Sequence, residues 1–270
     1  MKFTLLGSGA VRPDLEHWGP CQVVEVNGEH LVFDCGRGAT MRMVEAGISI
    51  KDLKRIFFTH HHMDHNCDFA YLFISSWTLD RDHPMEVYGP RGTGHFCDTL
   101  FKNLYLDDIN TRRFQPTYAD HGCEYEAHEI LQDEFTLQGN GYTVQMVHVI
   151  HKPQILDNLA FRIESEGKSI VIAGDNVICD SLMDLAEGCD LLVHECTFPS
   201  ERLENHKWGG FHTPPRQLGR WAKERGVKKL VIKHYAIQDG VEVEPMAEEV
   251  RSEFGDENLF VGHDFLEIEI

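Results

Sequence analysis

Short apolar segments separated by turns make up the first part of the chain. Segments 2–6, 21–26 and 31–34 alternate or cluster apolar residues as strands do, and Asn27-Gly28 supplies a hairpin turn between the last two. A helix is predicted from about Ala39 to Ala46, closed by Gly47. The apolar segment 55–59 then predicts the next strand. This order indicates a β meander at one edge of a sheet.

Strands and helices alternate through the rest of the chain, except in the middle. A buried helix is predicted at about 67–79 and a second one at 94–105, whereas 107–121 is polar and irregular and suggests a flap or an oligomer contact. The whole pattern favours an α/β protein with two similar halves and mixed sheets. The remaining predicted strands are 85–88, 142–149, 159–165, 169–173, 191–193, 229–233 and a strand pair within 259–270, and the remaining helices are 182–186, 214–225 and 244–254.

Four histidines and one aspartate lie within six residues directly after the strand at 55–59. The spacing is His60-x-His62-x-Asp64-His65. Strand side chains alternate, so His60 and His62 can point the same way, whereas the adjacent Asp64 and His65 suit a neighbouring second metal. Imidazoles and carboxylates are ligands of Zn, Fe and Mn. The alternative is a surface histidine cluster or a tag remnant, but a tag would lie at a terminus.

Composition and charge narrow the class of protein. A hydrophobic content of 42% is ordinary for a globular protein, and no 18-residue apolar run or secretory signal is visible, so no membrane span is expected. The formal charge of −19 repels phosphate backbones and makes nucleic acid an unlikely partner. Eight cysteines form no CxxC pair, which is typical of reduced thiols in a cytoplasmic protein.

Further ligand-type residues recur at predicted strand ends. Asp175 is the strongest candidate, because it follows an apolar strand between a glycine and an asparagine, although a turn aspartate remains an alternative. The chain has 17 histidines, so chance placement competes with function at the others. These others are His148 or His151, His194, His212, His234 and His263 with Asp264.

The ordered series of motifs resembles the metallo-β-lactamase superfamily, and within it the branch of ribonuclease Z and the related arylsulfatases and phosphodiesterases. The resemblance spans residues 3–266 and implies one hydrolase domain, 1–270, folded as a four-layer αββα sandwich with two mixed β-sheets. The motifs that carry it are His60-x-His62-x-Asp64-His65, Gly174-Asp175, Leu6-Gly7-Ser8-Gly9, Phe33-Asp34-Cys35-Gly36, Leu192-Val193-His194-Glu195-Cys196-Thr197-Phe198, His212-Thr213 and Lys233-His234-Tyr235.

The resemblance also implies two divalent metal ions, with zinc expected and iron or manganese as alternatives. Position by position, His60, His62 and His151 would hold one ion, Asp64, His65 and His234 the other, and Asp175 would bridge both. We prefer His151 to His148, because the family ligand lies just past its strand. A hydroxide shared by the two ions would then be the nucleophile.

The expected catalytic residues are Asp64, as a ligand, and the pair His212 and Glu195. In the resembled enzymes a histidine held by a glutamate protonates the leaving oxygen, and a carboxylate partner raises the pKa of such a histidine. The alternative is that His212 only caps the helix after Pro214 and that Glu195 only orients a ligand. Asp34 and Asp264 are expected to bind ligand imidazoles from behind. His194 is expected to be structural and His61 to point away.

These features predict a cytoplasmic hydrolase of a small ester, most plausibly a phosphodiester or an aryl sulfate. A tRNA 3′-processing endonuclease is the alternative, but only 23 residues separate His151 from Asp175, too few for the tRNA-gripping arm of that enzyme, and the basic loop is missing. Lactone or thioester hydrolysis, or a binding relative without catalysis, are further alternatives. A homodimer is expected because dimers are usual in the resembled branch.

Overall fold

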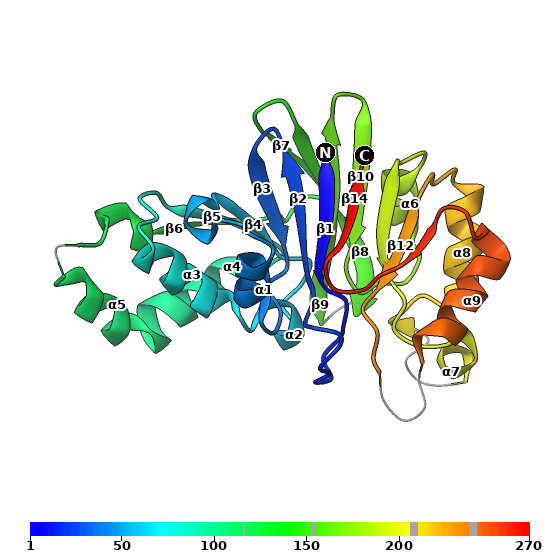
Figure 1. The fold of residues 1–270 in the computed structure, drawn as a ribbon, viewed down its shortest axis with the longest axis horizontal. Coiled ribbons are helices and arrows are strands. Elements are labelled where there is room, and N and C mark those ends of the chain that lie inside the picture. Colours follow the sequence, from blue (N-terminus) through cyan, green and yellow to red (C-terminus); the bar gives the residue numbers. More distant parts are fainter. Residues whose placement is uncertain (116, 153–154, 206–209, 238–241) are drawn as a thin grey trace.

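The strands form two mixed β-sheets that pack face to face (Figure 1). The computed structural model describes residues 1–115, 117–152, 155–205, 210–237 and 242–270. Each sheet has seven described strands. In order across the first sheet they are β14 (Leu266–Glu269), β1 (Lys2–Gly7), β2 (Cys21–Val26), β3 (Glu29–Phe33), β4 (Arg55–Phe57), β5 (Met85–Gly89) and β6 (Tyr125–Glu129). Across the second they are β13 (Leu259–Val261), β12 (Leu230–Lys233), β11 (Leu191–Glu195), β10 (Lys168–Ala173), β9 (Leu156–Ser165), β8 (Thr143–Lys152) and β7 (Glu134–Gln138).

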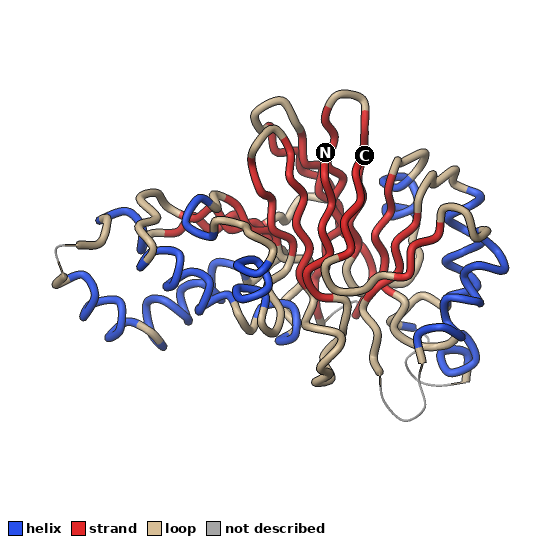
Figure 2. The backbone as a smooth tube through the Cα atoms, viewed as in Figure 1, coloured by secondary structure: helices blue, strands red, loops and turns tan. Residues whose placement is uncertain are grey.

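Helices cover the outer face of each sheet (Figure 2). On the first sheet they include α1 (Ala39–Glu45), α3 (Phe69–Thr78) and α4 (Thr93–Thr99), and on the second α6 (Asp180–Ala186), α8 (Pro215–Glu224) and α9 (Val243–Phe254). A third apolar cluster, with Phe33, Phe57 and Phe161 in ring contact, fills the space between the sheets. The predicted four-layer αββα sandwich with two mixed sheets is therefore confirmed. Among the described residues, none of the helices is long and apolar enough to cross a bilayer.

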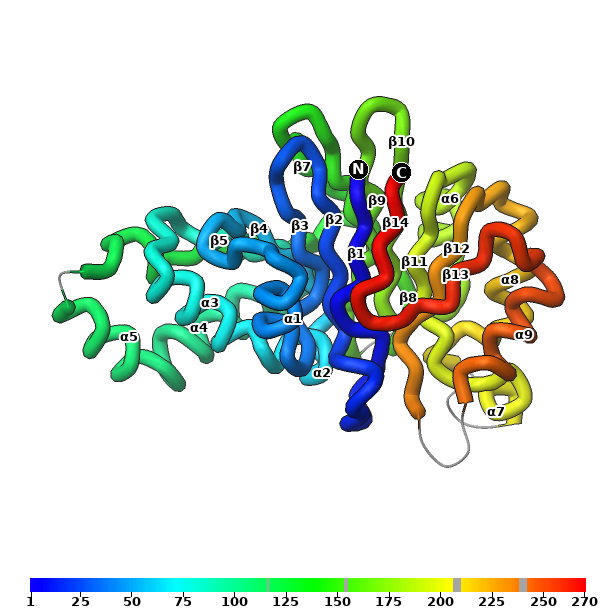
Figure 3. Tube along the Cα trace, in the orientation of Figure 1, coloured from blue at the N-terminus to red at the C-terminus, as the bar shows by residue number. Residues whose placement is uncertain are grey.

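The last two strands of the chain belong to different sheets and do not pair with each other. β13 pairs in parallel with β12, whereas β14 crosses to the first sheet and pairs antiparallel with β1 (Figure 3). The prediction of a strand pair within 259–270 is wrong for this reason. The segment between β13 and β14 connects the sheets, because the N–H of Gly262 donates to Ile232 of β12 and the N–H of Phe265 donates to Leu5 of β1.

The middle segment is helical for longer than its sequence indicated. After α4 the chain continues through a π-helical turn, Leu100–Leu104, into α5 (Leu106–Arg113). Only Ile109 of α5 is buried, so this helix has no apolar stripe by which it could be recognised. The expectation of irregular structure is therefore wrong for residues 107–113.

Candidate metal centre

The predicted ligand residues come from strand ends that meet at one edge of the sandwich. His60 follows β4, Asp175 follows β10 and His234 follows β12, while His151 lies near the end of β8. The carboxyl ends of parallel strands are the usual place for a functional site in such sheets. His65 and Asp64 are carried by the short helix α2 (Met63–Asn66) directly after the loop that holds His60 and His62.

Two groups of side chains converge at this edge, each able to hold a metal ion. In each group, one candidate ligand atom per residue lies within 4.8 Å of the others. The first group is His60, His62, His151 and Asp175, and the second is Asp64, His65 and His234. The division matches the one that the resemblance implied, and every member of both groups except His62 is buried.

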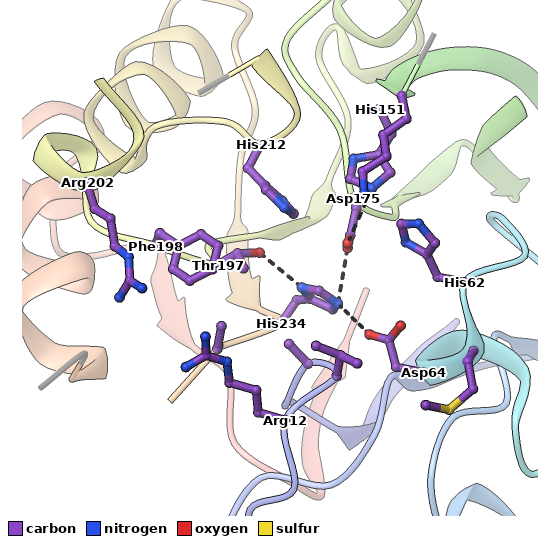
Figure 4. Close-up of a pocket in the computed structure, with 15 residues that line it drawn as sticks. Arg12, His62, Asp64, His151, Asp175, Thr197, Phe198, Arg202, His212 and His234 are labelled. Carbon is purple, nitrogen blue, oxygen red and sulfur yellow. Dashed lines mark hydrogen bonds and ion pairs between the residues drawn. The ribbon is translucent and has the colours of Figure 1, made fainter. Parts of the chain in front are cut away.

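Asp175 lies between the two groups. Its Oδ1 is 3.2 Å from Nε2 of His234 and 3.6 Å from Nε2 of His65, whereas its Oδ2 is 4.0 Å from Nε2 of His151 (Figure 4). One carboxylate oxygen thus faces each group. This is the arrangement that a bridging ligand requires.

Hydrogen bonds fix the orientation of His60 and His65 from behind. The Nδ1 of His65 donates to Oδ2 of Asp34 at 2.8 Å. The hydroxyl of Thr59 donates to the same carboxylate. Its Oγ1 can therefore only accept a hydrogen bond from Nδ1 of His60, 2.9 Å away. In both rings Nδ1 therefore carries a proton, and Nε2 points into the cluster, where it can bind a metal ion.

The same logic applies to His234 and His151. The hydroxyl of Thr197 donates to Glu195 and so accepts from Nδ1 of His234 at 3.0 Å. Nδ1 of His151 donates to the carbonyl oxygen of Phe211 at 2.7 Å. Four Nε2 atoms thus converge from different elements.

These inward-facing atoms fit divalent cations. Nε2 of His151 and Oδ1 of Asp175 are buried without a hydrogen-bond partner among the described residues. Nε2 of His65 and Nε2 of His234 face each other at 3.2 Å, although Nδ1 of each ring already donates on the opposite side, so a single ring proton is all that lies between them. Unpaired buried acceptors are costly, and a cation relieves this cost for all of them together.

Backbone geometry at the site is unusual in two places. Asp34 and His234 both have positive φ, 60° and 66°, which L-residues adopt rarely. Asp34 orients His65, and His234 belongs to the second group. Such conformations cost free energy and persist where the surroundings require them, as at functional sites.

Charge compensation in the cluster is visible in its pKa values. Burial would lower the pKa of His65, but Asp34 and Asp64 outweigh it and raise that pKa to about 9. Burial opposes ionisation of Asp64, yet His65 and His234 lower its pKa to about 2. Burial and the neighbouring His65 hold the pKa of His60 well below 6.5. A cation supplies the same compensation as the His65 proton and displaces it.

His212 and Glu195 form a buried pair beside the metal groups. Nδ1 of His212 lies 2.9 Å from Oε2 and 3.0 Å from Oε1 of Glu195. Burial would lower the pKa of His212, but the interaction with Glu195 raises it to about 9. α8 begins without a side-chain cap, so His212 does not cap that helix. Glu195 also accepts from the hydroxyl of Thr197, and it therefore contacts both His212 and the partner of His234.

A pocket of about 320 Å³ opens over the two metal groups. Figure 4 shows His62, Asp64, Asp175 and His212 turned toward it, with His234 at its floor. Three cationic side chains, Arg12, Lys152 and Arg202, and the ring of Phe198 also line it. The pocket thus brings the predicted metal ligands and His212 together with positively charged side chains on its walls.

The structure also shows where four other residues named in the sequence analysis lie. His61 points away from the cluster and contacts the hydroxyl of Thr93 at 2.8 Å. His194 is buried between Asn176 and its own chain, a structural position. His148 is in neither metal group. The expectation for Asp264 is wrong, because its carboxylate accepts from the backbone and hydroxyl of Ser8 and from the backbone of Trp18 rather than from an imidazole.

Sequence reasoning missed the residues that support the ligands from behind or shape the pocket. Thr59 and Thr197 stand beside predicted site residues, and their hydroxyls could have been suspected from that adjacency. The carbonyl of Phe211 has no signal in a sequence, because any residue supplies one. Arg12 and Arg202 come from segments about 190 positions apart and are brought together only by the fold.

Comparison with known proteins places the chain in a family. A family model described as anti-Pycsar protein Apyc1 matches residues 1–249. A curated ribonuclease Z of Mycobacterium bovis is 31% identical over 282 aligned positions, which cover 100% of this chain and 98% of that protein.

Solved structures share the fold at lower identity. Human tRNase Z, short form, has a TM-score of 0.76 and 22% identity, with 100% of this chain and 99% of that chain covered. Zn²⁺-bound PqqB from Methylobacterium extorquens has a TM-score of 0.68 and 12% identity, with both chains fully covered.

Proposed function

Because this chain belongs to the ribonuclease Z branch of the metallo-β-lactamase superfamily and to the family described as anti-Pycsar protein Apyc1, we propose that it is a dinuclear metal-dependent phosphodiesterase. Its relatives support the more general conclusion that the chain is a metal-dependent hydrolase of this fold. The observation that carries the proposal is the convergence of two ligand groups around the single carboxylate of Asp175.

The proposed ligand roles follow the two groups. His60, His62 and His151 would hold one ion and Asp64, His65 and His234 the other, with Asp175 shared. When bound, two divalent ions supply a water of lowered pKa as nucleophile and neutralise the phosphoryl oxygens. Zinc is the proposed metal, since imidazole and carboxylate ligands suit it and PqqB of the same fold holds Zn²⁺.

The role proposed for His212 is that of general acid. Its Nδ1 is held by Glu195, so the proton on Nε2 is the one available to a substrate in the pocket. Below about pH 9 the ring is charged and can donate this proton to the leaving oxygen. Glu195 keeps the ring charged and in one orientation.

Two kinds of phosphodiester compete as substrate. The pocket of about 320 Å³ suits a small phosphodiester. The named relatives favour the second candidate, a tRNA 3′ end, more strongly than they favour the small ester predicted from the sequence. The net charge of −19 and the short connection from β8 to β9 speak against a long RNA. Aryl sulfate and lactone or thioester hydrolysis stay predictions.

A substrate panel tests the proposal. Purified protein is stripped with chelator, reloaded with zinc, manganese or iron, and assayed with bis(p-nitrophenyl) phosphate, p-nitrophenyl sulfate, a lactone and a precursor tRNA. We expect metal-dependent hydrolysis of the phosphodiester and slower cleavage of the tRNA. Hydrolysis of the sulfate or the lactone alone would contradict the proposal, and preferential cleavage of the tRNA would favour the second candidate.

A further inference from the structure

Two arginines of the pocket lie on the side away from His62. Arg12 comes from the loop between β1 and β2, and Arg202 comes from α7 (Ser200–Glu204). Figure 4 shows both side chains on the same wall, near Phe198. Neither residue belongs to a metal group.

The arginines stand out against the charge of the protein. The chain carries −19 overall, yet the described residues that line this pocket include three cations and only two carboxylates, Asp64 and Asp175. Both carboxylates are proposed metal ligands, so bound ions would neutralise them. Two guanidinium groups give this wall a concentration of positive charge, so it is suited to an anionic group of a ligand.

Packing holds Arg202 in place. Its guanidinium carbon lies 4.9 Å from the ring centroid of Phe198, whose side chain is 8% exposed. An aromatic face of this kind orients an arginine without using its hydrogen-bond donors. The contact with Phe198 therefore positions Arg202 at the pocket without using its hydrogen-bond donors.

Lys152 has a different position. It directly follows the proposed metal ligand His151 in the chain and lines the same pocket. Lys152 therefore lies next to the metal groups. The arginine pair, by contrast, stands beyond His234 and Thr197 as seen from His62 in Figure 4.

From this arrangement we infer that Arg12 and Arg202 bind a second phosphate group of the substrate, apart from the phosphodiester at the metals. The inference rests on the proposed function and narrows its substrate class to small phosphodiesters that carry a further phosphate. Guanidinium groups match phosphate because their donors can bond two of its oxygens at once.

Calorimetric titration tests the second phosphate site without relying on turnover. The zinc-loaded protein is titrated with adenosine 3′,5′-bisphosphate and, separately, with adenosine 5′-monophosphate. We expect the bisphosphate to bind about tenfold or more tightly than the monophosphate, as hydrogen bonds between charged groups imply. Arg12→Gln and Arg202→Gln should each remove most of this preference and change the monophosphate affinity much less.

Two further variants separate the effect of the arginine's charge from the effects of its guanidinium shape and of its position in the pocket. Arg12→Lys keeps the charge and should retain part of the preference. Arg225→Gln removes an arginine at the end of α8, outside the pocket, and should behave as wild type. Unchanged melting temperatures and metal contents would show that the variants are folded and loaded.

Equal affinities for the two nucleotides in wild type would overturn the inference, as would no binding of either. Equal losses for both nucleotides in the glutamine variants would also overturn it, because the arginines would then serve the first phosphate. A preserved preference without phosphodiester hydrolysis would leave the second phosphate site standing and refute the proposed function instead.

Discussion

At the scale of single residues, His212 makes the most specific chemical claim. If it protonates the leaving oxygen, His212→Ala should slow the hydrolysis of esters with alkoxide leaving groups by about 10²–10⁴-fold. Esters of p-nitrophenol, whose anion leaves without a proton, should be slowed much less. The comparison of kcat for a methyl p-nitrophenyl and a dialkyl phosphodiester measures this, and equal slowing of both would remove His212 as the acid.

The same residue sets a pH dependence. Its pKa of about 9 lies above its ordinary 6.5, so the acid form persists up to about pH 9 and is lost above it. The stabilising His212–Glu195 interaction is likewise complete below pH 6.5 and lost as the pH rises through about 9. We expect kcat for alkyl esters to fall above about pH 9.

Glu195→Gln is the matched variant for this pH profile. Without the carboxylate, the largest influence that raises the pKa of His212 is gone while burial still lowers that pKa, so the alkaline fall in kcat should move to lower pH. A profile that Glu195→Gln leaves unchanged would show that another group causes the fall.

At the scale of elements, the site depends on close packing between strand ends of different sheets. Gly174 ends β10 against Thr59, where an added Cβ would lie 2.7 Å from the Cβ and Oγ1 of Thr59. Gly174→Ala should therefore displace Thr59, which holds both Asp34 and His60. We expect a loss of about 1–3 kcal/mol in the free energy of unfolding, measured by urea denaturation, and weaker metal binding.

Gly210→Ala is the control for this substitution, because a Cβ there meets no atom within 4 Å. It should leave both the stability and the metal affinity unchanged. Full stability and full metal content in Gly174→Ala would contradict the account of the strand contact.

Elements with strong periodicity could be predicted from the sequence, and those without it could not. The strands at 21–26 and 169–173 are confirmed nearly residue for residue, because each is an apolar run bounded by turn residues. β6 and β7 were missed because their side chains are only partly buried and their sequences are largely polar. α5 was missed because Ile109 is its single buried residue, which leaves no apolar periodicity in its sequence.

The site could be assembled from the sequence because its ligands follow strands in a motif order that the superfamily shares. The motifs predicted which residues converge, but they did not predict how the imidazole rings are oriented. The proton positions on Thr59 and Thr197, which aim the Nε2 lone pairs, depend on contacts between sheets. The left-handed conformations of Asp34 and His234 have only a weak signal in residue type, since aspartate and histidine adopt them more often than most other non-glycine residues.

At the scale of the whole molecule, the metal groups connect the two halves of the sandwich. His60 to His65 follow the first sheet, whereas His151, Asp175 and His234 belong to the second. Bound ions should therefore stabilise the folded chain as a whole. Removal by chelator should lower Tm by roughly 10 °C, given ions bound at about 1,000 times their Kd, and added zinc should restore it.

Asp175→Asn is the control for the chelation experiment. The variant should start from a lower Tm and show little further change with chelator. A Tm that chelator leaves unchanged in wild type would mean that the ions do not connect the halves.

The homodimer predicted from the sequence is tested separately, by light scattering after size exclusion.

The most direct test of the central claim is the rate of bis(p-nitrophenyl) phosphate hydrolysis measured against the number of metal ions bound per chain. Metal-free protein is titrated with zinc while both quantities are followed. We expect two ions per chain, no activity without metal and full activity only when both ions are bound. Hydrolysis by protein that holds no metal, or a chain that binds none, would contradict it.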